Sequence, residues 1–140
     1  MKRMILIGKS SAGKTSLTQK MRNEPVAYHK TQYVNFKDMI IDTPGEYAEN
    51  AELAAALALY SYEADVVGLL ISATDPFSLF PPNITPLVNR EVIGIVTQID
   101  QPNANPDRAE RWLRLSGCKK VFRTSAMTGE GVKELQEYLL

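Results

Sequence analysis

An octapeptide near the start of the chain, Gly-Lys-Ser-Ser-Ala-Gly-Lys-Thr at residues 8–15, constrains the fold more than any other stretch. It follows the apolar run Met4–Ile7 and leads into a segment with a helical pattern. Gly-x-x-x-x-Gly-Lys-Thr between a strand and a helix is the pattern of a phosphate-binding loop. Its glycines allow successive backbone amides to surround phosphate groups at the positive end of the helix. The octapeptide therefore predicts an α/β fold that binds a phosphate-bearing ligand.

The loop residues have distinct roles in this interpretation. Lys14 would bridge the terminal phosphates, and the Thr15 hydroxyl would bind magnesium. The alternative is an ordinary strand-to-helix turn that carries glycine, but the agreement between the sequence pattern and the element order favours a phosphate loop. Ser10 or Ser11 could still cap the helix. The predicted contacts to the ligand are Gly8, Lys9, Ser10, Ser11, Ala12, Gly13, Lys14, Thr15 and Ser16.

Short apolar runs recur along the chain with the length and β-branched content of strands that are buried on both faces. Helix-like segments lie between them, so strands and helices alternate as in a doubly wound fold. Strands are predicted at 4–7, 38–41, 66–71, 92–96 and 121–122, and helices at 14–22, 47–62, 106–115 and 131–139. The expected fold is one compact P-loop domain over residues 1–140, with a mainly parallel central sheet flanked by helices.

Two segments depart from this alternation. Residues 33–36 could form an edge strand that pairs antiparallel with 38–41. Four prolines within residues 75–89 forbid a long regular helix there. We therefore expect at most a short helical turn near 84–89.

Composition excludes several classes of protein. The 16 basic and 16 acidic residues cancel to a net charge of +0, which gives no electrostatic footprint for nucleic acid or an anionic membrane. No stretch approaches the roughly 18 apolar residues of a membrane span, and the start does not resemble a signal peptide. The chain is expected to be cytoplasmic. Its one cysteine, Cys118, is interpreted as a packing residue and not as a nucleophile.

A second motif, Asp42-Thr43-Pro44-Gly45, directly follows the predicted strand 38–41. A carboxylate at the carboxyl end of a buried strand lies at the edge where ligands bind in such sheets. Asp42 is predicted to hold magnesium through its water shell, and the Gly45 amide to contact the terminal phosphate. Taken alone, the tetrapeptide is also an ordinary turn with proline at its second position.

With these two motifs the chain resembles the small GTPases of the translation-factor-related class. The resemblance implies that Thr31, in Lys30-Thr31-Gln32, lies in a mobile loop and binds magnesium and the terminal phosphate. It also implies that Asp100 recognises guanine, because Thr97-Gln98-Ile99-Asp100 stands where the family usually has Asn-Lys-x-Asp.

The guanine motif departs from that pattern at two positions. Thr97 and Gln98 can partly replace the hydrogen bonds of the usual asparagine and lysine, but the lysine stem that covers the base is lost, so reduced affinity is expected. Thr124-Ser125-Ala126 matches the family's last motif, whose alanine amide meets the guanine carbonyl oxygen. The predicted base-binding residues are Thr97, Gln98, Asp100, Ser125, Ala126 and Met127.

A set of segments spread over essentially the whole chain carries a closer resemblance. These are residues 8–15, Lys30-Thr31-Gln32, residues 41–47, the Ala-Leu-rich segment after them, Asp75-Pro76 with Pro81-Pro82, and residues 94–100. Together they resemble the EutP/PduV family of ethanolamine- and propanediol-utilisation proteins. The resemblance implies a bacterial protein encoded with enzymes that degrade ethanolamine or propanediol, with a microcompartment shell or pathway-enzyme partner.

Glu46 determines the rate of GTP hydrolysis that the sequence predicts. It stands where many signalling GTPases carry the glutamine that orients the attacking water, and a carboxylate is poorly suited beside a charged phosphate. Slow hydrolysis is therefore predicted, with Lys14, Thr31, Gly45 and Glu46 as the catalytic set; alternatively, Glu46 only begins the helix 47–62. Three functions stay open: a GTP-hydrolysing switch, a nucleotide-binding interaction module with negligible turnover, and a phosphotransferase that acts on a small metabolite. ATP binding is not excluded.

Overall fold

The computed structural model describes residues 2–8, 13–23, 26–28, 32–34, 40–41, 64–78, 80, 82–87 and 90–140. Its strands are β1 (Met4–Ile7), β2 (Val26–Tyr28), β3 (Gln32–Val34), β4 (Ile40–Ile41), β5 (Val66–Ser72), β6 (Glu91–Thr97) and β7 (Val121–Arg123). Its helices are α1 (Lys14–Asn23), α3 (Pro106–Leu115) and α4 (Val132–Leu139), with a 3₁₀ turn at Thr85–Leu87. The predicted helix 47–62 lies outside the described residues.

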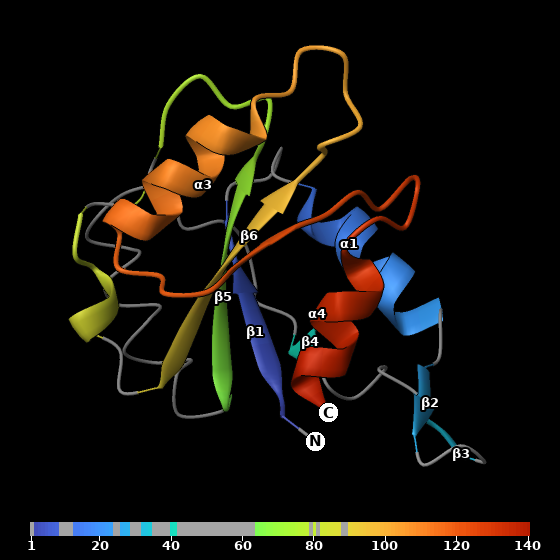
Figure 1. Cartoon of the computed structure of the whole chain (residues 1–140). Coiled ribbons are helices and arrows are strands. Elements are labelled where there is room, and N and C mark those ends of the chain that lie inside the picture. Colours follow the sequence, from blue (N-terminus) through green and yellow to red (C-terminus); the bar gives the residue numbers. More distant parts are fainter. Residues whose placement is uncertain are drawn as a thin grey trace.

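Within the described residues, the central sheet has five strands in the order β4-β1-β5-β6-β7, and every pairing among them is parallel. All of its carboxyl ends therefore lie at one edge (Figure 1). The register pairs Ile7 with Leu69 and Ser72 with Thr97, so β5 and β6 end side by side and β1 ends three residues before them. Such an edge is where open α/β sheets bind ligands.

Both faces of the sheet are buried, which explains why its strands are continuous apolar runs. Alternate residues of β1 serve the two faces: Met4 and Leu6 pack with α1 and α4, whereas Ile5 and Ile7 pack with α3. Figure 1 shows α3 on one side of the sheet and α1 with α4 on the other. The predicted parallel sheet with flanking helices is confirmed.

Local sequence sets the bounds of α3. The Asn105 side chain caps the helix by accepting a hydrogen bond from the Arg108 amide at 3.1 Å, and Pro106 occupies the first helical position. Asp107 in the first turn and Arg114 in the last complement the helix dipole. The observed bounds match the predicted helix 106–115.

The predicted antiparallel pairing of 33–36 with 38–41 falls largely on residues 35–39, which lie outside the described residues. In the part of the chain that the structure describes, β3 pairs antiparallel with β2, and β4 pairs parallel with β1. The β2 segment, Val26–Tyr28, was not recognised as a strand, because three residues are too short to show a periodic pattern. The 3₁₀ turn confirms the expected short helical turn, and α4 begins at Val132, one residue later than predicted.

No helix in the described ranges is long and apolar enough to cross a lipid bilayer.

Candidate nucleotide-binding site

A cavity of about 200 Å³ lies at the carboxyl edge of the sheet, where three distant segments meet. The first is the end of the phosphate loop with the start of α1, the second follows β6, and the third follows β7. The lining residues are Gly13, Ser16, Leu17, Thr97, Gln98, Asp100, Gln101, Thr124, Ala126 and Met127. Seven of these ten were predicted to contact the nucleotide, so the structure gathers phosphate-loop and base-motif residues around one cavity.

The amino end of α1 forms one wall of this cavity. Gly13 has a φ of +81°, and its carbonyl accepts the first helical hydrogen bond, from the Leu17 amide, at 3.0 Å. This left-handed backbone suits glycine. Lys14 is half-buried, and Thr15 and Ser16 are exposed at the start of the helix, whose positive end favours anions. Gly8 is buried at the end of β1.

Asp100 carries the carboxylate of the predicted base site, and Ser125 fixes it. The Ser125 hydroxyl donates to Asp100 Oδ1 at 2.8 Å and accepts from the Thr128 amide at 3.1 Å. Gln101 Nε2 reaches Asp100 Oδ2 at 3.5 Å. A carboxylate has about four acceptor positions, so Asp100 keeps capacity for a ligand with two adjacent N–H groups. Ser125 is buried and acts on Asp100, which makes it a positioning residue within the predicted base site.

The loop after β7 is closed by its own backbone. The Thr124 amide and hydroxyl both donate to the Val96 carbonyl, at 2.7 and 3.0 Å. The Ser125 amide donates to the Glu130 carbonyl at 2.9 Å, and the Gly129 amide donates back to the Ser125 carbonyl at 2.8 Å. These bonds fix the third segment of the cavity against the end of β6.

Gln98 occupies the position of the family's usual lysine and points toward the end of β5. Its backbone is left-handed, with a φ of 60°. Its Oε1 accepts hydrogen bonds from the Ser72 hydroxyl and, at 3.5 Å, from the Thr74 hydroxyl. The Asp75 carboxylate accepts from the Ser72 amide at 3.0 Å and closes the turn. Gln98 also lies against Gly13, where a built Cβ would stand 3.3 Å from its Nε2.

Sequence reasoning missed Ser72 and Thr74. Both hydroxyls lie just at or after the carboxyl end of β5, and they bond to each other at 2.8 Å. Their position at the binding edge of a parallel sheet was the available signal. Their contact with Gln98 could not be predicted, because it joins residues more than twenty positions apart.

Several predicted residues lie outside the described part of the chain: Lys9, Ser10, Ser11 and Ala12 of the phosphate loop, and Thr31, Asp42, Gly45 and Glu46 of the magnesium and catalytic sets. Their roles stay predictions. Thr15, the remaining predicted metal ligand, has an exposed hydroxyl-bearing side chain at the start of α1, which fits a magnesium ligand beside the phosphates.

Cys118 is only 2% exposed, and burial raises the pKa of its thiol to about 11. Such a thiol is protonated at neutral pH and is not a nucleophile. Its side chain packs in the cluster on the α3 face, which confirms the prediction of a packing residue.

The fold is of the P-loop, small-GTPase-like class, as its likeness to two solved domains shows. The G domain of the T. maritima FeoB iron transporter aligns with a TM-score of 0.60 at 24% identity, covering 98% of this chain and 95% of that chain. The cytosolic domain of that transporter in its GMPPNP form aligns with a TM-score of 0.59 at 24% identity, covering 98% of this chain and 61% of that one. The predicted fold class is confirmed.

Sequence comparison narrows the class to one family. The model for ethanolamine utilisation and propanediol utilisation proteins, PduV-EutP, matches residues 1–140. The propanediol utilization protein PduV of Citrobacter freundii is 48% identical, over 99% of this chain and 93% of that protein. "Probable acetate kinase EutP" of Escherichia coli is 30% identical, over 99% of this chain and 89% of that protein. The chain belongs to the PduV-EutP family.

Proposed function

We propose that this protein binds guanine nucleotides with magnesium and slowly hydrolyses GTP in ethanolamine or propanediol utilisation. The observation that carries the proposal is the position of Asp100. Its carboxylate, anchored by Ser125, lines the same cavity as Gly13 and Ser16 at the amino end of α1. A base held by Asp100 therefore places its phosphates toward the phosphate loop.

Guanine is the base that fits this arrangement. Its ring N–H and amino group present two adjacent donors, which match the carboxylate oxygens of Asp100; adenine lacks that pair on the corresponding edge. A site built around a specific hydrogen bond discriminates strongly against a ligand without it. GMPPNP, with which the T. maritima FeoB domain is described, carries the same base.

At the phosphate end, the chain supplies charge and backbone donors. Lys14 offers a cation to the terminal phosphates, and the amino end of α1 offers N–H groups and a favourable dipole. Magnesium, when bound, would neutralise charge on the phosphates and would be held by Thr15 with the predicted ligands Thr31 and Asp42. Glu46, at the position expected to face the attacking water, is the reason that turnover is proposed to be slow.

The test is nucleotide titration by calorimetry with GDP, GTP and ATP, followed by phosphate release. Lys14→Ala should abolish GTP binding with the fold intact, because the lysine neutralises phosphate charge and Lys14 is not part of the buried core. Lys133→Ala, which removes an exposed lysine from α4, is the matched control and should bind normally. Unchanged GTP affinity in Lys14→Ala would falsify the assignment, and binding without phosphate release would leave a nucleotide-dependent interaction module.

A second candidate is phosphoryl transfer to a small carboxylate, because the EutP relative at 30% identity is named a probable acetate kinase. In that reaction an acetate oxygen would attack the terminal phosphorus, and the nucleoside diphosphate would leave. One assay distinguishes the two functions. A kinase forms nucleoside diphosphate and acetyl phosphate, and only when acetate is present. A hydrolase releases inorganic phosphate whether or not acetate is present.

The pathway partner also belongs to this proposal. The family implies a bacterial setting beside ethanolamine- or propanediol-degrading enzymes, so we expect the protein to associate with a pathway enzyme or a microcompartment shell protein. Co-purification from cells induced with each substrate, with and without Lys14→Ala, tests whether the association depends on bound nucleotide.

A further inference from the structure

Two hydroxyl groups at the carboxyl end of β5 lie next to the nucleotide cavity without lining it. Ser72 ends β5 and is fully buried, and Thr74 follows two residues later and is half-buried. Both hydroxyls contact the side-chain amide of Gln98, and Gln98 lines the cavity. Any effect of these hydroxyls on a bound nucleotide would therefore pass through Gln98.

The turn that carries the two hydroxyls is held in place by its backbone. The Ala73 amide donates to the Thr97 carbonyl at 2.8 Å, and the Ala73 carbonyl accepts from the Asn105 amide at 2.7 Å. The Asp75 amide donates to the Ser72 carbonyl at 3.0 Å, and the Asp75 carboxylate accepts from the Ser72 amide, also at 3.0 Å. These bonds tie the turn to the end of β6 and to the start of α3. The two hydroxyls are therefore presented by a fixed framework.

The hydrogen bonds of the two hydroxyls determine which end of the Gln98 amide faces them. Ser72 Oγ accepts from the Thr74 amide at 3.2 Å, and its own proton is donated to Gln98 Oε1. The Thr74 hydroxyl can then donate to Ser72 Oγ, at 2.8 Å, or to Gln98 Oε1, at 3.5 Å. With the amide reversed, the hydroxyls would meet N–H groups, and one hydroxyl proton would have no acceptor among these three side chains. Because an unsatisfied buried donor is costly, the carbonyl end of Gln98 is fixed toward β5.

The nitrogen end of the same amide therefore lies on the side of the phosphate loop. A Cβ built at Gly13 would stand 3.3 Å from Gln98 Nε2 and 3.6 Å from Gln98 Cγ, so the side chain runs along the end of that loop. In the described ranges, the hydrogen bonds of the Gln98 side chain are made by its Oε1, and Nε2 donates to no protein group. An amide nitrogen carries two N–H donors, and a nucleotide presents oxygen acceptors on its sugar and phosphates. The cavity thus has a neutral donor of fixed orientation beside Gly13.

We propose that Ser72 and Thr74 are positioning residues for nucleotide binding: their hydroxyls hold the Gln98 amide so that its N–H groups face an oxygen acceptor of the bound nucleotide. Neither hydroxyl contacts the ligand, and both act through Gln98. The inference rests on the proposed binding of a nucleotide in this cavity. It does not require hydrolysis, or a preference for guanine over adenine.

A double-mutant cycle on GDP affinity, measured by calorimetry, separates this role from a purely structural one. Ser72→Ala should weaken GDP binding about fivefold, which is the scale of one hydrogen bond, and Gln98→Ala should weaken it at least as much. Because Ser72 acts through Gln98, adding Ser72→Ala to Gln98→Ala should change the affinity by less than about twofold. Independent contributions would instead multiply to about 25-fold.

Conservative variants test the hydroxyl of Thr74 and the direction of the amide. Thr74→Val removes the hydroxyl at nearly constant volume and should weaken GDP binding about threefold, whereas Thr74→Ser keeps the hydroxyl and should bind as the wild type does. Gln98→Glu keeps an acceptor for Ser72 but replaces the N–H groups by a charged oxygen. It should therefore weaken GDP binding more than Gln98→Ala does.

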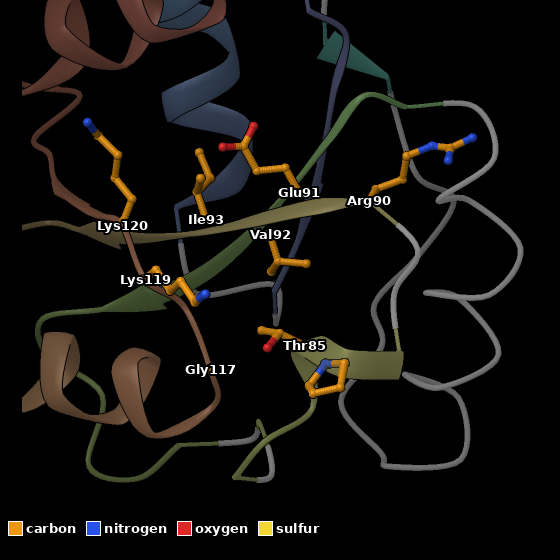
Figure 2. Close-up of a pocket in the computed structure, with 9 residues that line it drawn as sticks. Thr85, Arg90, Glu91, Val92, Ile93, Gly117, Lys119 and Lys120 are labelled. Atoms are coloured by element: carbon orange, nitrogen blue, oxygen red, sulfur yellow. The ribbon is translucent and has the colours of Figure 1, made fainter.

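Matched controls come from the opposite edge of the sheet. A hollow of about 430 Å³ there is lined by the first three residues of β6 and by Thr85, among others (Figure 2). The Thr85 amide donates to the carbonyl of Ser116, a fully buried residue whose hydroxyl donates to the Trp112 carbonyl at 3.1 Å. Ser116→Ala removes a buried serine hydroxyl, as Ser72→Ala does, and Thr85→Val removes a threonine hydroxyl. Both controls should bind GDP as the wild type does.

The nucleotide-free protein provides a measurement that does not depend on binding. Ser72→Ala should move the NMR signals of the Gln98 side-chain amide, because the amide carbonyl loses a hydrogen bond. Ser116→Ala should leave those signals in place. If Ser72→Ala does not fold in a thermal melt, Thr74→Val, at a half-buried position, replaces it in the cycle and in the NMR measurement.

Three results would overturn the inference: wild-type GDP affinity in a folded Ser72→Ala, equal losses from Ser72→Ala with and without Gln98→Ala, or unmoved Gln98 amide signals in Ser72→Ala. A lowered melting temperature with unchanged GDP affinity would leave the hydroxyls a structural role only. A wild-type protein that binds no GDP would refute the proposed function as well, whereas normal GDP binding by wild type and Ser72→Ala alike would refute this inference alone.

Discussion

Two glycines in the loop after β7 offer a matched test of how tightly the base site is built. Gly129 and Gly131 both have left-handed backbones, with φ of +84° and +76°. A Cβ added at Gly131 would lie 1.9 Å from the Arg123 carbonyl oxygen, whereas one added at Gly129 would find Lys20 Cε no closer than 3.5 Å. The two alanine substitutions thus share the backbone strain, and only Gly131→Ala adds a collision with backbone.

The expected losses follow from these contacts. A left-handed residue with a side chain costs about 1–2 kcal/mol, and overpacking against neighbours that cannot move away costs a further 1–3 kcal/mol or so. Gly129→Ala should therefore lower the free energy of unfolding by about 1–2 kcal/mol, and Gly131→Ala by about 2–5 kcal/mol. At roughly 3 °C per kcal/mol for a chain of this size, the melting temperatures should fall by about 4 °C and about 10 °C.

Urea unfolding of both variants, followed by circular dichroism, measures the difference. Equal losses would refute the clash argument and leave only backbone strain. A second readout follows from the site: Gly131 is the N-cap of α4, directly after the loop that carries Ser125, so Gly131→Ala should also weaken GDP binding, while Gly129→Ala should affect it less. Wild-type GDP affinity in a destabilised Gly131→Ala would separate stability from the geometry of Asp100.

Four further predictions concern the base site and the charged surface of α3. Asp100→Ala should abolish the preference for guanine over adenine nucleotides in competition titrations; equal ATP and GTP affinities in the wild type would contradict this. Ser125→Ala should weaken GDP binding about fivefold, the equivalent of about one hydrogen bond; unchanged GDP affinity would show that Asp100 does not need Ser125. Gln98→Lys should tighten GDP binding, because the lysine stem covers the base. It should also lower the free energy of unfolding by about 1 kcal/mol, because lysine cannot accept the hydrogen bonds from the Ser72 and Thr74 hydroxyls. A variant that binds GDP no more tightly disproves the covering argument. Hydrogen bonds from Arg114, and then from Arg123, lower the pKa of Glu110 below its ordinary value of 4.5. The ionised Glu110 therefore stabilises the fold above that pH, and this stabilisation is lost as the pH falls through the lowered pKa. Glu110→Gln should reduce the acid dependence of the free energy of unfolding, by no more than about 1 kcal/mol because the partners are exposed.

The sequence predicted the parts of the fold that depend on local pattern. The strand Met4–Ile7 and the helix Pro106–Leu115 have the predicted bounds, because an uninterrupted apolar run and an Asn-Pro cap leave few alternatives. The parallel direction of the strands followed from the alternation of strands and helices, since parallel strands need crossovers. Most of the described base-site residues were also predicted, because the motifs after β6 and β7 fall at the carboxyl ends of neighbouring strands.

What could not be predicted depends on where side chains point across long sequence separations. The β2–β3 pairing depends on register, and the close approach of Gly117 to Thr85 joins residues far apart in sequence; no periodicity reports either. Ser125 was predicted to bind nucleotide, which stays a prediction; the bond from its hydroxyl to Asp100 was not predicted. The roles of Thr31 and Asp42 remain predictions.

The position of Gln98 changes how the base site is understood. The sequence suggested a residue that merely fails to cover the base, but its carbonyl oxygen is occupied by hydroxyls at the end of β5, and its amide lies beside Gly13. It therefore connects the end of β5 to the phosphate loop. Met127 lines the cavity and is 79% exposed, so we expect it to provide the apolar cover for the base. A flexible thioether packs adaptably against an aromatic ring, whereas we expect base specificity to come from the carboxylate of Asp100. If affinity and base choice rest on different side chains in this way, Met127→Ala should weaken GDP and ATP binding alike, and Asp100→Ala should remove only the difference between them.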